Sequence, residues 1–196
     1  MDCALSSAER LLDSRGSPGL GALAVFGTLA RFGDDALRYA HSRGIRIVLL
    51  APRESYAHAS IALTRMGVDV DAWPAPPAGL FVVEERCVYL RSRSPMTVAH
   101  LFGHALDCAL GGGVYRSGID PRVRALFSAA RAFITPYAAT GLDEYFAESL
   151  RAYVEANDSA SVWSPATRER LQRIDAPMYV YVDELFANAF ERLAPV

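Results

Sequence analysis

Apolar positions follow two different periods along the chain. Two compact apolar runs in the first half, 45–51 and 80–91, have the length and the β-branched and aromatic content of short strands. A charged pair interrupts the second run after residue 84, so this run predicts two strands, 80–84 and 87–91, joined as a hairpin or meander. Most other apolar positions recur every three or four residues, which is the period of an amphipathic helix.

Capping residues and glycines predict where the helices begin and end. In the first half, Ser6 opens one helix through a capping box, and Gly33-Asp34 divides a longer one, with Asp34 capping its second part. In the second half, a capping residue precedes proline at Ser94, Asp120 and Ser164, which is the preferred order at a helix start. The expected helices span 6–16, 19–42, 54–66, 95–110, 121–133 and 142–156, with one from 165 and one over 178–193.

The order of these elements is mixed at first and helical afterwards. This order predicts an α+β fold with a small mixed sheet and no sustained βαβ alternation. The sequence contains no internal repeat and no low-complexity linker. We therefore expect one domain over residues 1–196, with a sheet-containing lobe over 1–93 and a helical lobe over 94–196.

Composition limits the classes of function. The 196 residues are 52% hydrophobic and 21% charged, with a formal net charge of -2, which is typical of a globular protein and indicates no nucleic-acid partner. The longest apolar stretch, 19–30, is too short and too rich in glycine to cross a membrane. The N-terminus lacks the pattern of a secretory signal, and the three cysteines show no metal-ligand spacing, which predicts a cytoplasmic protein with reduced thiols.

Two histidines four residues apart carry the candidate chemistry. His100 and His104 lie in TVAHLFGHALD, and on a helix this spacing places both imidazoles on one face, where they can bind one metal ion. A later expected helix carries Glu144 and Glu148 at the same spacing. A catalytic zinc site uses three protein ligands and leaves one position for water or substrate, and two histidines plus Glu144 make such a set. The other interpretation is that these are solvated or core-edge side chains without a ligand.

Two separated segments, TVAHLFGHALD and PYAATGLDEYFAESL, resemble the signature segments of the anthrax lethal factor-like metallopeptidases, which include the Pro-Pro endopeptidases. The strand pair before the first segment also resembles that family, and the resemblance extends over about residues 45–154. It implies a zincin-like fold in which His100, His104 and Glu144 are the zinc ligands. It also implies that Tyr137 is the active-site tyrosine, which donates a hydrogen bond to the developing oxyanion of a cleaved amide.

Carboxylates near the ligands are candidates for supporting roles. Ligating histidines usually donate their other N–H to a carboxylate or a carbonyl. By helical phase, the nearest carboxylates are Asp107, three residues after His104, and Glu148, one turn beyond Glu144. We expect Glu148 to support a ligand, whereas for Asp107 a supporting role and a surface ion pair are equally good interpretations.

The sequence departs from the family motif, His-Glu-x-x-His, at the second position, which is Leu101. The missing glutamate is the general base that takes a proton from the metal-bound water and passes it to the leaving amine. Loss of general acid–base help typically costs about 10²–10⁴-fold in rate. We therefore expect proteolysis to be strongly impaired while metal binding is kept.

Three explanations of Leu101 stay open at this point. The chain is an engineered inactive peptidase, a natural pseudopeptidase that only binds, or a metalloenzyme redirected to another reaction on an apolar substrate. An open 2-His-1-carboxylate site takes Zn²⁺, and also Fe²⁺ or another divalent metal, so the ligands alone do not select the ion. A rival of a different class is a structural protein in which the histidine pair is incidental.

The resemblance also implies a path for the substrate. In the family, a substrate peptide runs along the edge strand beside the active-site helix, which we expect near 87–91, with Val88 and Tyr89 in contact. Trp73, on the proline-rich loop 71–79, either flanks the cleft or packs on the core. The expected partner is a peptide or a small-molecule substrate.

Overall fold

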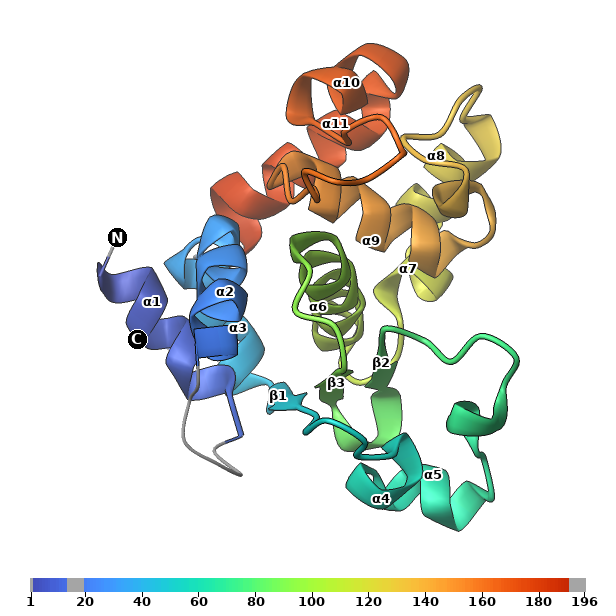
Figure 1. The fold of residues 1–196 in the computed structure, drawn as a ribbon. Helices are drawn as coiled ribbons and strands as arrows, with labels where there is room; N and C mark the ends of the chain where they lie inside the picture. The colour runs from blue at the N-terminus through green and yellow to red at the C-terminus, as the bar shows by residue number, and fades with distance from the viewer. Residues whose placement is uncertain (1, 14–19, 191–196) are drawn as a thin grey trace.

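The computed structural model describes residues 2–13 and 20–190, and three helices form its N-terminal part (Figure 1). They are α1 (Asp2–Leu11), α2 (Leu20–Leu29) and α3 (Asp34–Ser42), with a 3₁₀ turn, η1 (Ala30–Phe32), at the end of α2. Gly33 has a φ of 80°, a conformation that glycine adopts without strain, and it turns the chain into α3. The predicted break is therefore present, although Gly33 and not Asp34 is the capping residue.

In the described part of the chain, three short strands form one sheet. They are β1 (Arg46–Leu49), β2 (Gly79–Val82) and β3 (Cys87–Leu90). Their spatial order is β1-β3-β2, with β1 parallel and β2 antiparallel to β3. Val88 lies opposite Ile47 on one side and Phe81 on the other. Thus β3 is the central strand and β2 is an edge, which corrects the expectation of an edge strand near 87–91.

The segment that was expected as one helix over 54–66 forms two helices, α4 (Tyr56–Ala59) and α5 (Ile61–Met66). Ser60 between them is extended, and its hydroxyl accepts a hydrogen bond from the backbone N–H of Leu63 to cap α5. Two 3₁₀ turns complete this region, η2 (Val70–Ala72) and η3 (Val83–Glu85).

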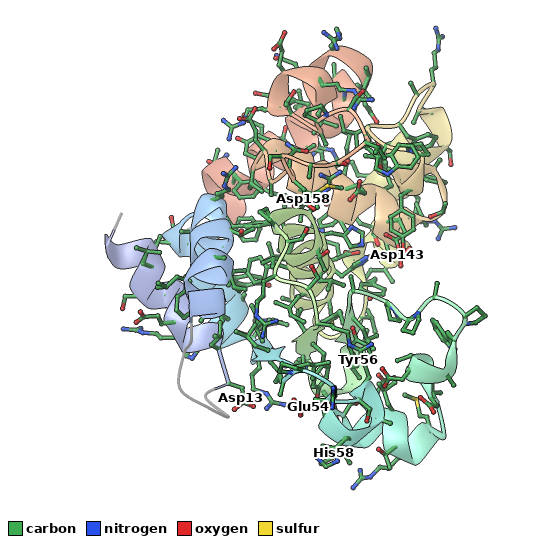
Figure 2. The ribbon with its side chains drawn as sticks, viewed as in Figure 1. Asp13, Glu54, Tyr56, His58, Asp143 and Asp158 are labelled. Atoms are coloured by element: carbon green, nitrogen blue, oxygen red, sulfur yellow. The ribbon has the colours of Figure 1, made fainter. Side chains whose placement is uncertain are left out.

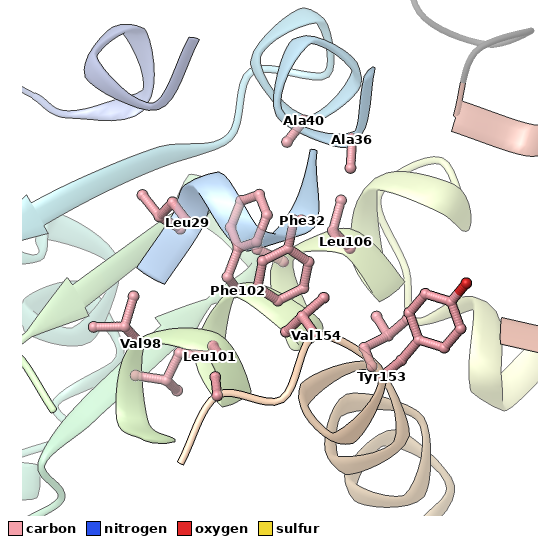
Figure 3. Packing of buried hydrophobic residues seen from close by; sticks show 14 of the residues in the cluster. Leu29, Phe32, Ala36, Ala40, Val98, Leu101, Phe102, Leu106, Tyr153 and Val154 are labelled. Carbon is pink, nitrogen blue, oxygen red and sulfur yellow. The ribbon is translucent and has the colours of Figure 1, made fainter. Parts of the chain in front are cut away.

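Helix α6 (Pro95–Leu110) runs through the middle of the molecule, and its bounds agree with the sequence prediction (Figure 1). Ser94 caps its first turn through a side-chain hydrogen bond, and proline follows at the first helical position. From residue 98 to residue 109, every residue except His100 is buried. Figure 3 shows Phe102 against Phe32 of η1, with ring centroids 4.9 Å apart in an edge-to-face arrangement. The helix therefore packs on α2, the sheet and α9 at once.

Regular elements after α6 are all helical in the described residues. They are α7 (Arg116–Ile119), α8 (Pro121–Ala129), the 3₁₀ turn η4 (Tyr137–Ala139), α9 (Leu142–Tyr153), α10 (Arg168–Ile174), α11 (Ala176–Glu184) and the π-helical turn η5 (Leu185–Ala189). The whole is a helix-rich α+β fold with a small mixed sheet. None of the described helices combines the length and the apolar character that a membrane span requires.

The predicted helices of this region are confirmed in part. Helix α7 was not predicted, and the last expected helix, 178–193, ends beyond the described residues. The expectation of a helix start at Ser164 is wrong, because α10 begins later and is capped by Thr167. The reason lies in Asn157, whose side-chain amide pairs with both the N–H and the C=O of Ala166, at 2.9 Å each, and so holds this segment in a loop.

Candidate metal centre

The first turn of α9 brings a carboxylate to the histidine pair of α6. His100 and His104 lie one turn apart on α6, and Glu144 lies in the first turn of α9. The Nε2 atoms of the two histidines are 3.1 Å apart, and each is 3.3 Å from Oε2 of Glu144. Three possible ligand atoms from two helices thus form a nearly equilateral triangle.

The size of this triangle fits a small divalent cation. In a tetrahedral zinc site with bonds of about 2.0–2.1 Å, the ligand atoms lie roughly 3.3 Å apart. Oε2 of Glu144 and Nδ1 of His104 are buried and have no hydrogen-bond partner among the described residues. A buried carboxylate oxygen without a partner is destabilising, and a cation between the three atoms would satisfy it. The donor set therefore fits zinc.

A glycine lets the two helices approach each other. Gly103 lies between the two histidines on α6, and a Cβ at this position would be 2.9 Å from Cα and 3.1 Å from Cβ of Ala147 on α9. Only a residue without a side chain tolerates this distance. The close approach of α6 and α9 at Gly103 is what brings Glu144 within reach of the histidines.

The charge of Glu144 is favoured by its neighbours. Burial opposes the ionised form, but the imidazoles of His104 and His100 outweigh it and hold the pKa of Glu144 below its ordinary value. The carboxylate is therefore ionised at neutral pH, which is the form that binds a metal ion.

Glu148 lies one turn beyond Glu144 and contacts the other side of His100. Its Oε1 is 3.0 Å from Nδ1 of His100, and Arg151 donates to both carboxylate oxygens at 2.8 and 2.9 Å. Burial opposes ionisation here too, but the hydrogen bonds from His100 and Arg151 outweigh it, so the pKa of Glu148 lies far below its usual range. An ionised Glu148 accepts the Nδ1 hydrogen of His100 and leaves Nε2 as an acceptor directed at the triangle.

Tyr137, in η4, borders the same triangle. Its ring centroid is 5.4 Å from that of His100, and its side chain is half exposed. Burial of the hydroxyl and the charge of Glu144 raise the pKa of Tyr137 to about 12. The phenol is therefore protonated at neutral pH and can donate a hydrogen bond.

Asp107 does not form the surface ion pair that was one of the two interpretations of the sequence. It is completely buried, and its two oxygens accept hydrogen bonds from the backbone N–H and the hydroxyl of Ser117, at 2.8 and 2.6 Å. Burial raises the pKa of Asp107 to about 6 in spite of these bonds. Its carboxyl connects the end of α6 to α7, because Ser117 offers two donors, and it makes no surface ion pair.

Leu101 packs toward the sheet. Its side chain is 7% exposed, and a Cβ at Gly79 would overlap Cδ1 of Leu101. Gly79 begins the edge strand β2, so the leucine occupies the space that a side chain on this strand would otherwise fill. Figure 3 shows Leu101 among the core residues of α6, close to Val98.

The residues that were expected to contact substrate lie elsewhere. Val88 and Tyr89 are only 1% and 2% exposed, because β3 is paired on both sides and covered on its faces. The expectation that they contact a substrate is therefore wrong. Trp73 is half exposed and is not among the residues that line the cleft beside the triangle.

That cleft has a volume of about 420 Å³ and lies between the first turns of α6, the segment 135–137 and the loop 157–165. His100, Tyr137 and Glu148 line it beside the metal triangle, and Trp163 lines it as well. Sequence reasoning missed Trp163, since this residue is far from both motif segments along the chain. The available signal was a tryptophan next to Ser164-Pro165 in a loop rich in small residues.

Comparisons with known proteins agree with this architecture. No protein-family model and no curated protein matches the sequence. Among solved structures, the fold is similar to that of the Pro-Pro endopeptidase PPEP-2 from Paenibacillus alvei, with a TM-score of 0.65 at 20% sequence identity. The likeness covers 91% of this chain and 99% of that chain. At this identity the likeness concerns the fold alone.

Proposed function

We propose that this chain is a protein of the zinc metallopeptidase type in which His100, His104 and Glu144 hold the metal ion. The observation that carries the proposal is the triangle of ligand atoms, with sides of 3.1 and 3.3 Å and a buried carboxylate oxygen that has no other partner among the described residues. The fold likeness to a Pro-Pro endopeptidase supports the same class.

The neighbouring side chains suit a peptide substrate. A zinc ion in such a site polarises a carbonyl group and lowers the pKa of a water molecule. Tyr137, protonated at neutral pH, can donate a hydrogen bond to the carbonyl oxygen as that oxygen becomes negative. Glu148 and Arg151 hold the ring of His100 in one orientation and one tautomer.

Hydrolysis also needs a group that accepts a proton beside the attacking water, and Leu101 occupies the position that provides it in the family motif. An alkyl side chain can neither accept a proton nor orient a water molecule. We therefore propose that the site holds metal and peptide, and that it hydrolyses peptide bonds about 10²–10⁴-fold more slowly than a site with the glutamate.

The proposed partner is an extended peptide. The solved structure with the similar fold is named as an endopeptidase, which is an enzyme that cleaves peptides. The strand beside α6 that can accept a further strand is the edge strand β2 (Gly79–Val82), in place of the buried β3. Pairing of a peptide with β2 would lay its backbone past Leu101 and toward the metal centre.

Metal analysis tests the metal site directly. We expect purified protein, incubated with zinc and then dialysed, to retain about one equivalent of zinc by elemental analysis. His104→Ala and Glu144→Gln should lose it, because each removes one of three ligands. His58→Ala, which changes an exposed histidine on α4, is the matched control and should retain it. A native protein that retains no zinc, or a His104→Ala variant that retains it fully, would contradict the proposal.

A further inference from the structure

The cleft beside the metal centre is small and continuous with it. Its volume of about 420 Å³ is near the lower end of the range for ligand sites, roughly 300–1,000 Å³, and is enough for one or two side chains of a peptide. Because His100 and Tyr137 line the cleft, a side chain in it would belong to a residue near the bond at the metal centre.

Charged side chains that line the cleft are already paired. Glu148 receives two hydrogen bonds from Arg151, at 2.8 and 2.9 Å. Asp158 accepts hydrogen bonds from the hydroxyl of Ser94 at 2.5 Å and from the backbone N–H of Met96 at 3.1 Å, beside the start of α6 where Figure 2 labels it. A charged ligand group would lose its hydration on entry without gaining a new partner of opposite charge.

Apolar side chains supply a large part of the walls, and uncharged polar side chains complete them: Thr97, Thr135, Asn157, Ser161 and Ser164. Met96, Pro136, Trp163 and Pro165 all border the cleft. Trp163 is 61% exposed although it is the largest apolar side chain there, and the adjacent Val162 is 94% exposed. Large apolar side chains that remain exposed at the rim of a cleft are typical of a binding surface, since a ligand that covers them removes apolar area from water.

The loop that carries Trp163 is held at its base. Asn157 pairs with both backbone groups of Ala166, at 2.9 Å each, so that the two ends of the loop are joined. Arg170 donates to two carbonyl groups of the loop at 3.3 Å each. Trp163 therefore lies on a loop that hydrogen bonds hold in place, and it needs little reorganisation to contact a ligand.

From the pairing of the charges, the apolar walls and the held loop, we infer that this cleft is a subsite for an uncharged apolar side chain of a bound peptide, with Trp163 as one of its walls. The inference rests on the proposed function for the position of the peptide backbone. The walls themselves do not depend on metal, so the two ideas can fail separately.

Tryptophan fluorescence gives a local test, because the chain has two tryptophans, Trp73 and Trp163. The Trp73→Phe variant keeps the cleft residue as its one tryptophan, and the Trp163→Phe variant is the matched control. Each variant, with and without zinc, is titrated with three pools of capped heptapeptides. The pools share the same mixture of small flanking residues and differ in the central one, which is leucine, aspartate or lysine.

We expect the leucine pool to change the emission of Trp73→Phe saturably and to leave Trp163→Phe unchanged. The charged pools should bind about tenfold more weakly, since burial of a leucine side chain is worth more than this factor. Calorimetry should show a similar loss for the leucine pool with Trp163→Ala. Equal binding of all pools, or no binding to a folded and zinc-loaded protein, would overturn the inference and leave the metal site intact. Selective leucine binding by a protein that fails to retain added zinc would support the subsite, and the failure to retain zinc would refute the proposed metal function.

Discussion

The alkyl side chain of Leu101 cannot accept a proton, and it lies on α6 between His100 and His104, which both direct Nε2 at Glu144. We expect Leu101→Glu to raise the rate of peptide hydrolysis by zinc-loaded protein about 10²–10⁴-fold, because a carboxylate can take the proton of the attacking water. Cleavage of a peptide library, followed by mass spectrometry, measures this gain. Leu101→Gln has the same shape without the base and is the control; equal rates for the two zinc-loaded variants would count against the peptidase mechanism.

Asp107 gives the stability of the metal-free protein a distinct pH dependence. Its pKa, raised by burial to about 6 from an ordinary 3.8, means that the folded protein keeps a proton that the unfolded chain has lost between those values. The contribution of Asp107 to the free energy of unfolding is therefore present at low pH and falls by up to about 3 kcal/mol as the pH rises from about 4 to 7.

Replacement of Asp107 by asparagine should remove this dependence, since the amide does not titrate. We compare the unfolding free energy of Asp107→Asn with that of the native protein at each pH. This difference should shift in favour of the variant by about 2–3 kcal/mol between pH 4 and pH 7. Urea unfolding at both pH values, with a chelator present, measures the change. A constant difference between the two proteins would show that Asp107 titrates normally.

The grouping of site residues was predictable where it follows from their spacing along a helix. The i, i+4 pairs placed His100 with His104 and Glu144 with Glu148 on shared helix faces, and the structure brings the two faces together. Trp163 was not predictable in this way, because its position depends on how a loop folds back over α6.

At the scale of elements, the crossing of α6 and α9 positions the ligands, and the absence of a side chain at Gly103 allows the two helices to lie this close. We expect Gly103→Ala to separate the helices, to weaken zinc binding and to cost about 1–3 kcal/mol of stability through overpacking. This loss should exceed the gain of about 1 kcal/mol that alanine brings to a helix interior. Zinc titration and thermal unfolding measure the two effects.

Gly27→Ala is the matched control for this prediction. Gly27 is also inside a helix, α2, but a Cβ there would meet nothing within 4 Å. We expect this variant to gain up to about 1 kcal/mol from helix propensity and to bind zinc normally. Unchanged zinc affinity in Gly103→Ala would mean that the close approach does not set the ligand geometry.

Local signals predicted elements with unequal success. The capping serine and the glycine run fixed α6 at 95–110, because its ends are determined within the helix itself. The capping signal at Ser164 was overridden by Asn157, a partner from outside the segment. Strand positions were also predicted closely, but their order was not, and so the edge strand was assigned to β3 in place of β2.

At the scale of the whole molecule, the sequence predicted the α+β class from the order of its elements. It could not show that α6 would be surrounded by α2, the sheet and α9, because these contacts join residues far apart in the chain. The buried face of α6 is nearly continuous, and such a helix has too little amphipathic contrast to indicate which neighbour covers which side.

Arg151 belongs to two parts of the molecule at once. It holds Glu148, which contacts His100, and it donates to Oδ1 of Asn157, at 3.2 Å, in the frame of the loop that carries Trp163. Any coupling free energy that Arg151 provides between the loop and the metal centre must be the same in both directions. For the proposed peptide and zinc, the factor by which one ligand changes the affinity for the other is therefore the same whichever binds first.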